Sequence, residues 1–167
     1  VFDTLPKKVP GDVIHTDSRL PMEMKPQEGF KWVITSPPYV GMVTYNQDQW
    51  LRDWFSGGKA EVDYRKLSQF GYTSQNNYIS EISKVWKNVT DVCAPKARMM
   101  IRLGVLPAHK GNPHEIIQKS IDAAGNEWKI ITIKTAGNAS GATRQAEHFG
   151  LKIGTARQEI DCYLEMS

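Results

Sequence analysis

The sequence predicts an α/β fold: a mostly parallel β-sheet with helices packed on its faces and an antiparallel hairpin at one edge. Apolar runs of strand length alternate with stretches whose apolar residues recur every three or four positions, as in amphipathic helices. The last two strand candidates have no helical pattern between them, which suits an antiparallel hairpin. The 167 residues are 40% hydrophobic and 23% charged, an ordinary globular composition.

The length and composition suit one domain and exclude several classes of protein. Two cysteines in 167 residues cannot form a disulfide scaffold. No apolar run approaches the roughly 20 residues that span a bilayer, and no signal peptide opens the chain. We therefore expect a soluble, cytoplasmic protein with reduced thiols. The net charge of +3 neither demonstrates nor opposes a nucleic-acid partner. The chain begins at Val1 and stops just after a strand-like run, so we expect it to be a piece of a longer reading frame.

The N-terminal half contains two strand candidates and a long irregular segment. Residues 13–16 form a short apolar run, and residues 32–35 form a second. Pro37 and Pro38 end the second strand, because a central strand cannot continue through two prolines. Residues 40–73 lack a clear period and are expected to form a loop with one short helix around residues 49–55.

The C-terminal half alternates between helix and strand. A helix is predicted over residues 74–94, capped by Thr73 or Ser74 and ended by Pro95. Asn112 and Pro113 open another helix, and Gly125 stands where its C-terminal cap belongs. Strands are expected at residues 98–103, 128–133 and 159–166, the last with alternating Ile160, Cys162 and Leu164.

The segment Ser36-Pro37-Pro38-Tyr39 directly follows the strand at 32–35 and leaves two interpretations open. It is either a proline turn with Tyr39 packed as a lid, or a ligand site. The second interpretation rests on the position, because ligands of open α/β sheets bind beyond the carboxyl ends of the strands. A rigid turn there holds carbonyls and a hydroxyl in place, and an aromatic ring can face a planar ligand.

This segment resembles the (Asp/Asn/Ser)-Pro-Pro-(Tyr/Phe) motif of the S-adenosylmethionine-dependent DNA amino-methyltransferases. The wider pattern is similar too. An Asp-containing turn at residues 15–21 precedes the unit at residues 32–39, and a helix followed by Pro95–Ile101 resembles a helix–strand unit of the family without its glycine pair. The resemblance implies a Rossmann-like methyltransferase fold, with residues 1–167 forming one catalytic domain or part of one.

The resemblance also implies a chemistry. The enzyme would transfer a methyl group from S-adenosylmethionine to the exocyclic amine of a flipped DNA base, with N4-cytosine favoured over N6-adenine. Ser36, Pro37, Pro38 and Tyr39 would be the catalytic residues. The Ser36 side chain and the Pro37 carbonyl would accept hydrogen bonds from the amine, whose lone pair is otherwise delocalised into the ring. The Tyr39 ring would stack on the base, which must leave the duplex to reach it.

The cofactor site is only partly visible in the sequence. By resemblance, Asp17 lies near the adenine end of S-adenosylmethionine; alternatively, it is a turn residue that caps local backbone. The Phe-x-Gly-x-Gly loop of the family is not found, and Gly150 and Gly154 lack its flanking strand and helix. We expect that loop on a missing segment or on a second polypeptide.

DNA is the expected partner. Candidate contacts are Arg144, Lys152 and Arg157 in a polar segment that could equally be a solvated loop. The aromatic residues after the motif could close over a base or form a partly buried cluster. Neither Cys93 nor Cys162 follows a proline, which argues against methylation of a ring carbon. No His or Cys spacing indicates a metal site.

Three alternatives to a complete DNA methyltransferase remain. The chain could be a DNA-binding subunit or the catalytic half of a split enzyme, either of which needs a partner for catalysis. It could also be an RNA or protein amide methyltransferase, whose motif more often begins with Asn or Asp. A glycine loop in the flanking reading frame would favour the complete enzyme.

Overall fold

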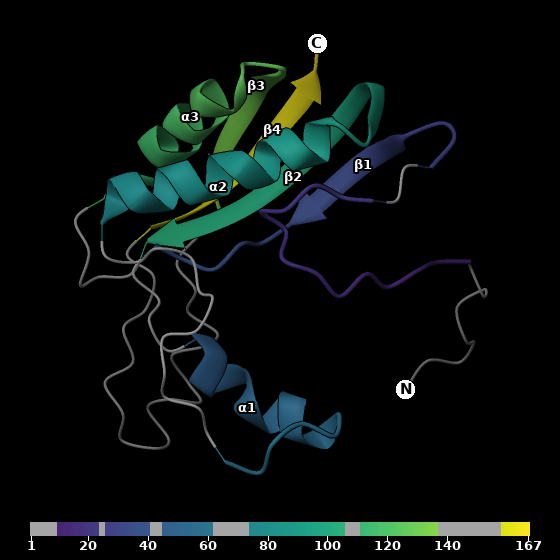
Figure 1. Ribbon diagram of the computed structural model, residues 1–167. Helices are drawn as coiled ribbons and strands as arrows, with labels where there is room; N and C mark the ends of the chain where they lie inside the picture. Colours follow the sequence, from purple (N-terminus) through teal and green to yellow (C-terminus); the bar gives the residue numbers. More distant parts are fainter. Residues whose placement is uncertain (1–9, 24–25, 41–44, 62–73, 106–110, 137–157) are drawn as a thin grey trace, which may run out of the picture.

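A computed structural model describes residues 10–23, 26–40, 45–61, 74–105, 111–136 and 158–167 (Figure 1). These residues form a mixed α/β structure of four strands and three helices. In chain order the elements are β1 (Phe30–Thr35), α1 (Tyr45–Phe55), α2 (Gln75–Thr90), β2 (Cys93–Val105), α3 (Pro113–Ala124), β3 (Trp128–Thr135) and β4 (Gln158–Met166).

The four strands form one sheet in the order β1-β2-β4-β3. Strand β1 pairs with β2 in parallel, whereas β4 pairs antiparallel with both β2 and β3. The expectation of a mostly parallel sheet is therefore wrong for the described residues, because β4 inserts between β2 and β3 and runs against both. The expected antiparallel pairing of the last two strands at one edge is confirmed.

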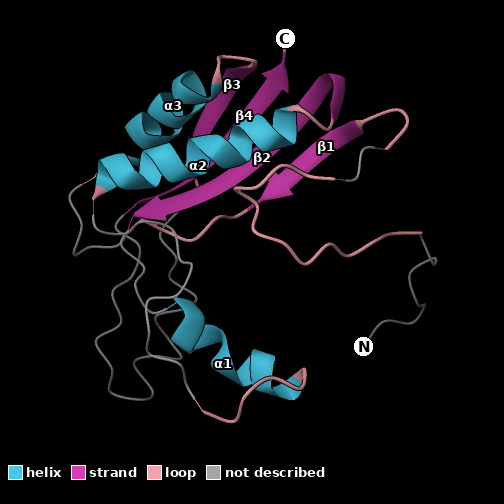
Figure 2. Ribbon diagram, viewed as in Figure 1, coloured by secondary structure: helices cyan, strands magenta, loops and turns pink. Residues whose placement is uncertain are grey.

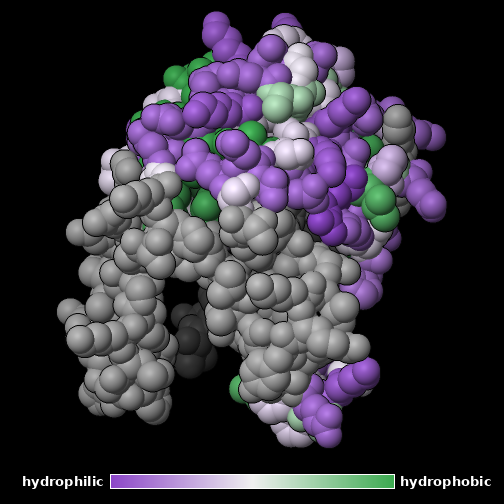
Figure 3. All heavy atoms as spheres, turned by 60° about the vertical axis from the view of Figure 1, so that its left-hand side comes forward, coloured by the Kyte–Doolittle hydropathy of each residue, from purple (hydrophilic) through white to green (hydrophobic). Residues whose placement is uncertain are grey.

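Helices α2 and α3 cover the same face of the sheet, whereas α1 lies apart from both layers (Figures 1 and 2). The core lies between that face and the two helices. Trp86 of α2 is buried there, and its indole Nε1 donates to the hydroxyl of Ser120 on α3 at 3.0 Å. Alternate residues of β4, namely Ile160, Cys162 and Leu164, are fully buried beneath the helices, which confirms the predicted pattern. The outer surface on this side is mostly hydrophilic (Figure 3).

The predicted helix caps are confirmed. Ser74 is the N-cap of α2, where its hydroxyl accepts a hydrogen bond from the backbone of Asn77 at 3.1 Å. Asn112 caps α3 in the same way, with Pro113 in the first turn. Gly125 ends α3 in the left-handed conformation with φ 116°, which a glycine adopts at no steric cost.

Two predicted boundaries are wrong. Residues 13–16 form no strand: no other strand lies beside them among the described residues, and Val13 is almost fully exposed. Pro95 does not end α2, which stops at Thr90; it lies inside β2. The ladder tolerates this proline because the register shifts there, since Phe30 pairs with Cys93 but Trp32 pairs with Arg98.

The other face of the sheet carries charged and aromatic side chains. Arg98 of β2 lies over the ring of Trp32 on β1, with its guanidinium 5.4 Å from the ring centroid. Arg102 makes a bidentate interaction with Asp161 of β4, in which Nε and Nη2 donate to the two carboxylate oxygens at 2.7 Å each. Ile34 of β1 is 79% exposed on this edge strand.

Among the described residues no helix is long and apolar enough to cross a membrane.

Candidate functional site

The four motif residues lie just beyond the carboxyl end of β1, as the sequence predicts. The strand ends at Thr35, one residue before Ser36. Ser36 is exposed, Pro37 is buried, and Pro38 and Tyr39 are half-buried. The motif therefore presents a hydroxyl and part of an aromatic ring to solvent from a turn whose first proline is anchored in the protein.

Three contacts fix this turn to the neighbouring elements. The hydroxyl of Tyr78 on α2 donates to the Pro38 carbonyl at 2.8 Å. The backbone N–H of Val40 donates to the Gly104 carbonyl of β2 at 3.2 Å. The ring of Tyr39 lies against Gly104, where an added Cβ would come within 2.6 Å of the Tyr39 Cε2 atom.

Sequence reasoning missed Tyr78 and Gly104 as part of this site. Tyr78 lies in the apolar stripe of α2 and is a core residue, with 1% exposure. A buried tyrosine hydroxyl nevertheless needs a hydrogen-bond partner, and that requirement was the available signal. Gly104 lies within a strand, where glycine often marks the close approach of another group.

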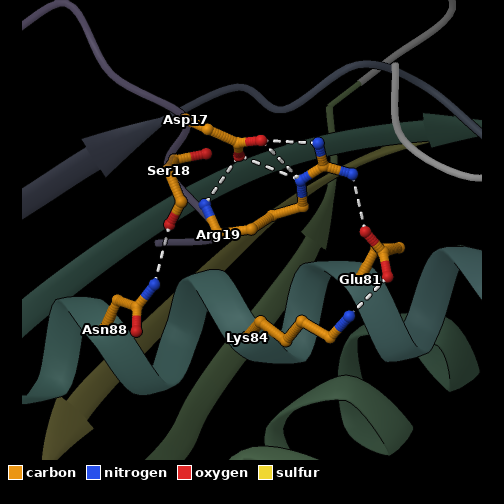
Figure 4. A network of polar contacts seen from close by, with 6 residues as sticks. All are labelled: Asp17, Ser18, Arg19, Glu81, Lys84 and Asn88. Carbon is orange, nitrogen blue, oxygen red and sulfur yellow. Dashed lines mark hydrogen bonds and ion pairs between the residues drawn. The ribbon is translucent and has the colours of Figure 1, made fainter. Parts of the chain in front are cut away.

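The second predicted site residue, Asp17, lies in a turn that packs along α2 (Figure 4). Arg19 wraps back onto Asp17 and donates its backbone N–H and its Nε to Asp17 Oδ1, each at 2.9 Å. Arg19 also reaches Glu81 of α2, with Nη1 2.7 Å from Oε2. Lys84 completes the ionic chain on the same Glu81 carboxylate at 2.6 Å. An uncharged bond from Asn88 to the Ser18 carbonyl, 3.0 Å long, anchors the turn further along the helix.

This network determines the electrostatics of the turn. The hydrogen bonds from Arg19, first through its side chain, hold the pKa of Asp17 at about 2. The pKa of Glu81 is lowered by its hydrogen bonds to Lys84 and Arg19. Both oxygens of Asp17 already accept from Arg19, so the guanidinium occupies part of the acceptor capacity that a cofactor hydroxyl or amine would use. The cofactor role of Asp17 remains a prediction.

Helix α2 brings the turn and the motif together. Tyr78 and Glu81 are three residues apart and lie on one face of the helix, separated by about 4.5 Å along its axis. The contacts of Arg19 and of the Pro38 carbonyl are therefore about one helical turn apart.

Beside the Asp17 turn lies an open hollow of about 680 Å³, lined by Ile14, His15, Thr16, Leu20, Pro21, Met22 and Glu23.

The aromatic residues after the motif form an exposed cluster on α1. Trp50 and Trp54 are stacked with ring centroids 6.3 Å apart, and Phe55 lies 5.1 Å from Trp54. Trp54 is 44% and Phe55 77% exposed. The sequence left two interpretations of these aromatic residues, a partly buried cluster and a lid that closes over a base. The first is wrong for Phe55, which is exposed. The second stays a prediction.

The remaining candidate residues have different outcomes. Arg144, Lys152 and Arg157 lie outside the described residues, as do Gly150 and Gly154. Cys162 is fully buried and Cys93 half-buried, and neither is in a disulfide. Cys162 therefore packs as a small core residue, and its burial raises the pKa of the thiol to about 12. Within the described ranges no three His, Cys, Asp or Glu side chains are grouped to hold a metal ion.

Comparisons with known proteins give structural neighbours only. No protein-family model matches the sequence, and no curated protein matches it. Two crystal structures of a "putative DNA modification methylase" from Thermus thermophilus, one of them a selenomethionine derivative, are similar to this chain. They are 14% and 17% identical to it, with TM-scores of 0.45 and 0.44. The matches cover 90% and 91% of this chain but 50% and 52% of those chains, so this chain spans about half their length.

Proposed function

We propose that this protein is the catalytic part of a DNA methyltransferase that methylates the exocyclic amine of a flipped base, with N4-cytosine preferred over N6-adenine. S-adenosylmethionine would supply the methyl group. One observation carries the proposal: Ser36-Pro37-Pro38-Tyr39 stands at the carboxyl end of β1, anchored to the parallel strand β2. The carboxyl ends of parallel strands meet at one edge of a sheet, which is where open α/β sheets bind ligands.

The residues of the motif suit this chemistry. Ser36 is exposed at the turn, so its hydroxyl oxygen can accept a hydrogen bond from the amine of a base. The Pro37 carbonyl would accept the second amine hydrogen. Both acceptors would draw the nitrogen lone pair out of conjugation as the amine becomes pyramidal. The half-buried ring of Tyr39 would stack on the base, which offsets part of the cost of flipping it.

In this proposal the cofactor site needs residues beyond those that the structure describes. The sequence contains no strand–glycine loop–helix unit, and the carboxylate of Asp17 is engaged by Arg19. We propose that a second unit, in another segment or another polypeptide, supplies the glycine loop and covers the exposed face of β1. Parallel strands are usually buried on both faces. Trp32 and Ile34 of β1 are nevertheless 50% and 79% exposed here, which supports a covering unit on that face.

Methyl transfer from radiolabelled S-adenosylmethionine to DNA tests the proposal. The complete enzyme should label DNA, and digestion should release N4-methylcytosine. Ser36→Ala should lower the rate by roughly 100-fold, the usual effect of removing one preorganised electrostatic contact. Tyr39→Ala should lower it by roughly 10- to 100-fold, because stacking contributes about 1–3 kcal/mol. The melting temperature should change little in either variant. Tyr39→Phe is the matched control and should stay active, because the ring and not the hydroxyl stacks. Full activity of Ser36→Ala or of Tyr39→Ala would refute the catalytic assignment.

The second candidate is a non-catalytic subunit that binds DNA and depends on a partner for activity. The absence of a glycine loop in this sequence favours it. Ser36→Ala separates the cases, because methylation by the complete assembly should not change if this chain is non-catalytic. Titration calorimetry with S-adenosylmethionine tests the feature that both candidates share, because these 167 residues alone should bind the cofactor weakly or not at all. Micromolar affinity would show that the chain holds a cofactor site of its own.

DNA contacts are proposed for Arg144, Lys152 and Arg157, joined by the exposed Arg52 and Lys59 of the α1 region. The net charge of +3 is small, so affinity must come from a local patch. Replacing Arg144 and Arg157 together by alanine should flatten the slope of log affinity against log salt by about two, close to one per phosphate contact. An unchanged slope would place the DNA surface elsewhere.

A further inference from the structure

We infer that Tyr78 of α2 and Gly104 of β2 are positioning residues, which together set the orientation of the Tyr39 ring. The inference rests on the proposed function, in which Tyr39 stacks on the target base. It extends that function from the four motif residues to the two elements that hold them.

The backbone on both sides of Tyr39 is fixed. Proline holds its own φ near about −65°, and a residue that precedes proline is confined to extended ψ values. In Pro37-Pro38 the one freely rotating torsion is therefore ψ of Pro38, which aims the Cα–Cβ bond of the next residue. The 2.8 Å bond from the buried Tyr78 hydroxyl to the Pro38 carbonyl fixes that torsion.

The next peptide is held as well. The N–H of Val40 donates to the Gly104 carbonyl at 3.2 Å, and Val40 forms an isolated parallel bridge with Val105. Val40 itself is 5% exposed. Tyr39 is thus left with its own side-chain torsions alone.

Gly104 restricts those torsions. A methyl group at position 104 would lie 2.6 Å from Cε2 and 2.7 Å from Cδ2 of Tyr39, distances that real Cβ atoms do not tolerate. The ring therefore occupies the space that a side chain would fill. The φ of Gly104 lies outside the left-handed region, so its backbone conformation does not itself require glycine.

Because glycine weakens a strand, the presence of the Tyr39 ring is the feature that accounts for a glycine here. A residue that merely completed β2 would be better as alanine or valine. Gly104 and Tyr78 act on the same side chain from two directions, one through space and one through the backbone. A ring held in this way is preorganised, so a base that arrives does not have to order it.

The first test is kinetic. In the complete enzyme, Gly104→Ala and Tyr78→Phe should each lower kcat by roughly 10- to 100-fold, the cost of a misplacement of about 1 Å, while KM for S-adenosylmethionine stays the same. Ser120→Ala is the matched control, because it also removes a buried hydrogen bond from α2, the one made by Trp86, which lies about 12 Å along the helix axis from Tyr78. It should keep its kcat.

The second test is a double-mutant cycle. If Gly104 acts through Tyr39, Gly104→Ala should have no further effect on kcat once Tyr39 is alanine, because the added methyl group then has room. The same should hold for Tyr78→Phe in the Tyr39→Ala background. The inference would be overturned if the fold-decrease in kcat of each double mutant equalled the product of the fold-decreases of its two single mutants.

A structural readout separates this inference from the proposed function. The ring carbons of Tyr39, labelled with carbon-13 and identified through Tyr39→Phe, should change chemical shift in both Gly104→Ala and Tyr78→Phe but not in Ser120→Ala. Unchanged shifts would overturn the positioning role even in an active enzyme. Changed shifts in a protein that never methylates DNA would support the positioning role and refute the proposed function.

Discussion

Helix α2 holds two segments of the chain by different kinds of bond. The motif turn is attached through the hydroxyl of Tyr78, a buried and uncharged group. The Asp17 turn is attached mainly through Arg19 and Glu81, whose side chains remain 20% and 22% exposed. Ion pairs that keep some contact with water are weakened by salt, whereas an uncharged hydrogen bond is not, and leaving its acceptor without a partner is costly. The proposed base-binding side of the site should therefore be rigid, and the Asp17 side should respond to salt and pH.

The largest effect on stability is expected from Tyr78→Phe. This change removes the donor and leaves the Pro38 carbonyl without its partner, so the free energy of unfolding should fall by about 1–3 kcal/mol. Urea denaturation at low and high salt measures it. The loss should be the same at both salt concentrations; a loss that disappears in high salt would erase the contrast between the two attachments.

Asn88→Ala should have an intermediate effect. It removes the uncharged bond to the Ser18 carbonyl, and Asn88 is 8% exposed. We expect a loss of about 1 kcal/mol, again insensitive to salt, by the same denaturation experiment. A value below that of Arg19→Gln would mean that the ionic network, and not this bond, attaches the Asp17 turn.

Arg19→Gln should cost less, up to about 1 kcal/mol, and the cost should shrink as salt rises. Lys31→Gln is the control, because its ion pair with Glu28 joins two largely exposed side chains at 3.2 Å. That variant should be indistinguishable from the wild type. A salt-independent loss in Arg19→Gln would show that the network behaves as a buried one.

The smallest effect concerns protonation of Asp17. Its pKa is lowered from the ordinary value of 3.8 to about 2, chiefly by the side-chain hydrogen bonds from Arg19. A carboxyl with a depressed folded-state pKa stabilises the fold above its unfolded pKa. Its contribution is lost as pH falls from about 4 towards 2. Titration of the Asp17 carboxyl carbon by NMR should give a midpoint near 2 in the wild type and a higher one in Arg19→Gln. Equal midpoints would contradict the assigned cause.

Patterns within a few neighbouring residues predicted most helices and strands and their caps. They did not predict which strands pair with one another. Ser74, Asn112 and Gly125 act within one turn of the chain, so their cap roles are visible in sequence. The insertion of β4 between β2 and β3 depends on contacts between distant segments, for which the apolar pattern has no signal. Residues 13–16 have the composition of a strand, but among the described residues no other strand lies beside them.

The candidate site also has a part that the sequence predicts and a part that depends on contacts between distant segments. Ser36 to Tyr39 form a contiguous motif, and its place at the end of β1 follows from the two prolines. Tyr78 and Gly104 come from other elements, and their contacts with the motif arise only when α2 and β2 pack beside β1. Both residue types are unusual at their positions, since Tyr78 places a hydroxyl in an apolar stripe and Gly104 places a glycine within a strand. Neither feature indicates which residue it contacts.

The position of β4 has a consequence for how the chain folds as it is synthesised. β4 is the last described element to leave the ribosome, yet it stands between β2 and β3 in the sheet. Until it arrives, the facing edges of β2 and β3 lack the strand that they pair with in the described structure. The nascent protein must therefore keep these strand edges in water until β4 emerges, a state that invites pairing with other chains. Chaperones that shield strand edges would act on the segment before β4 has joined the sheet.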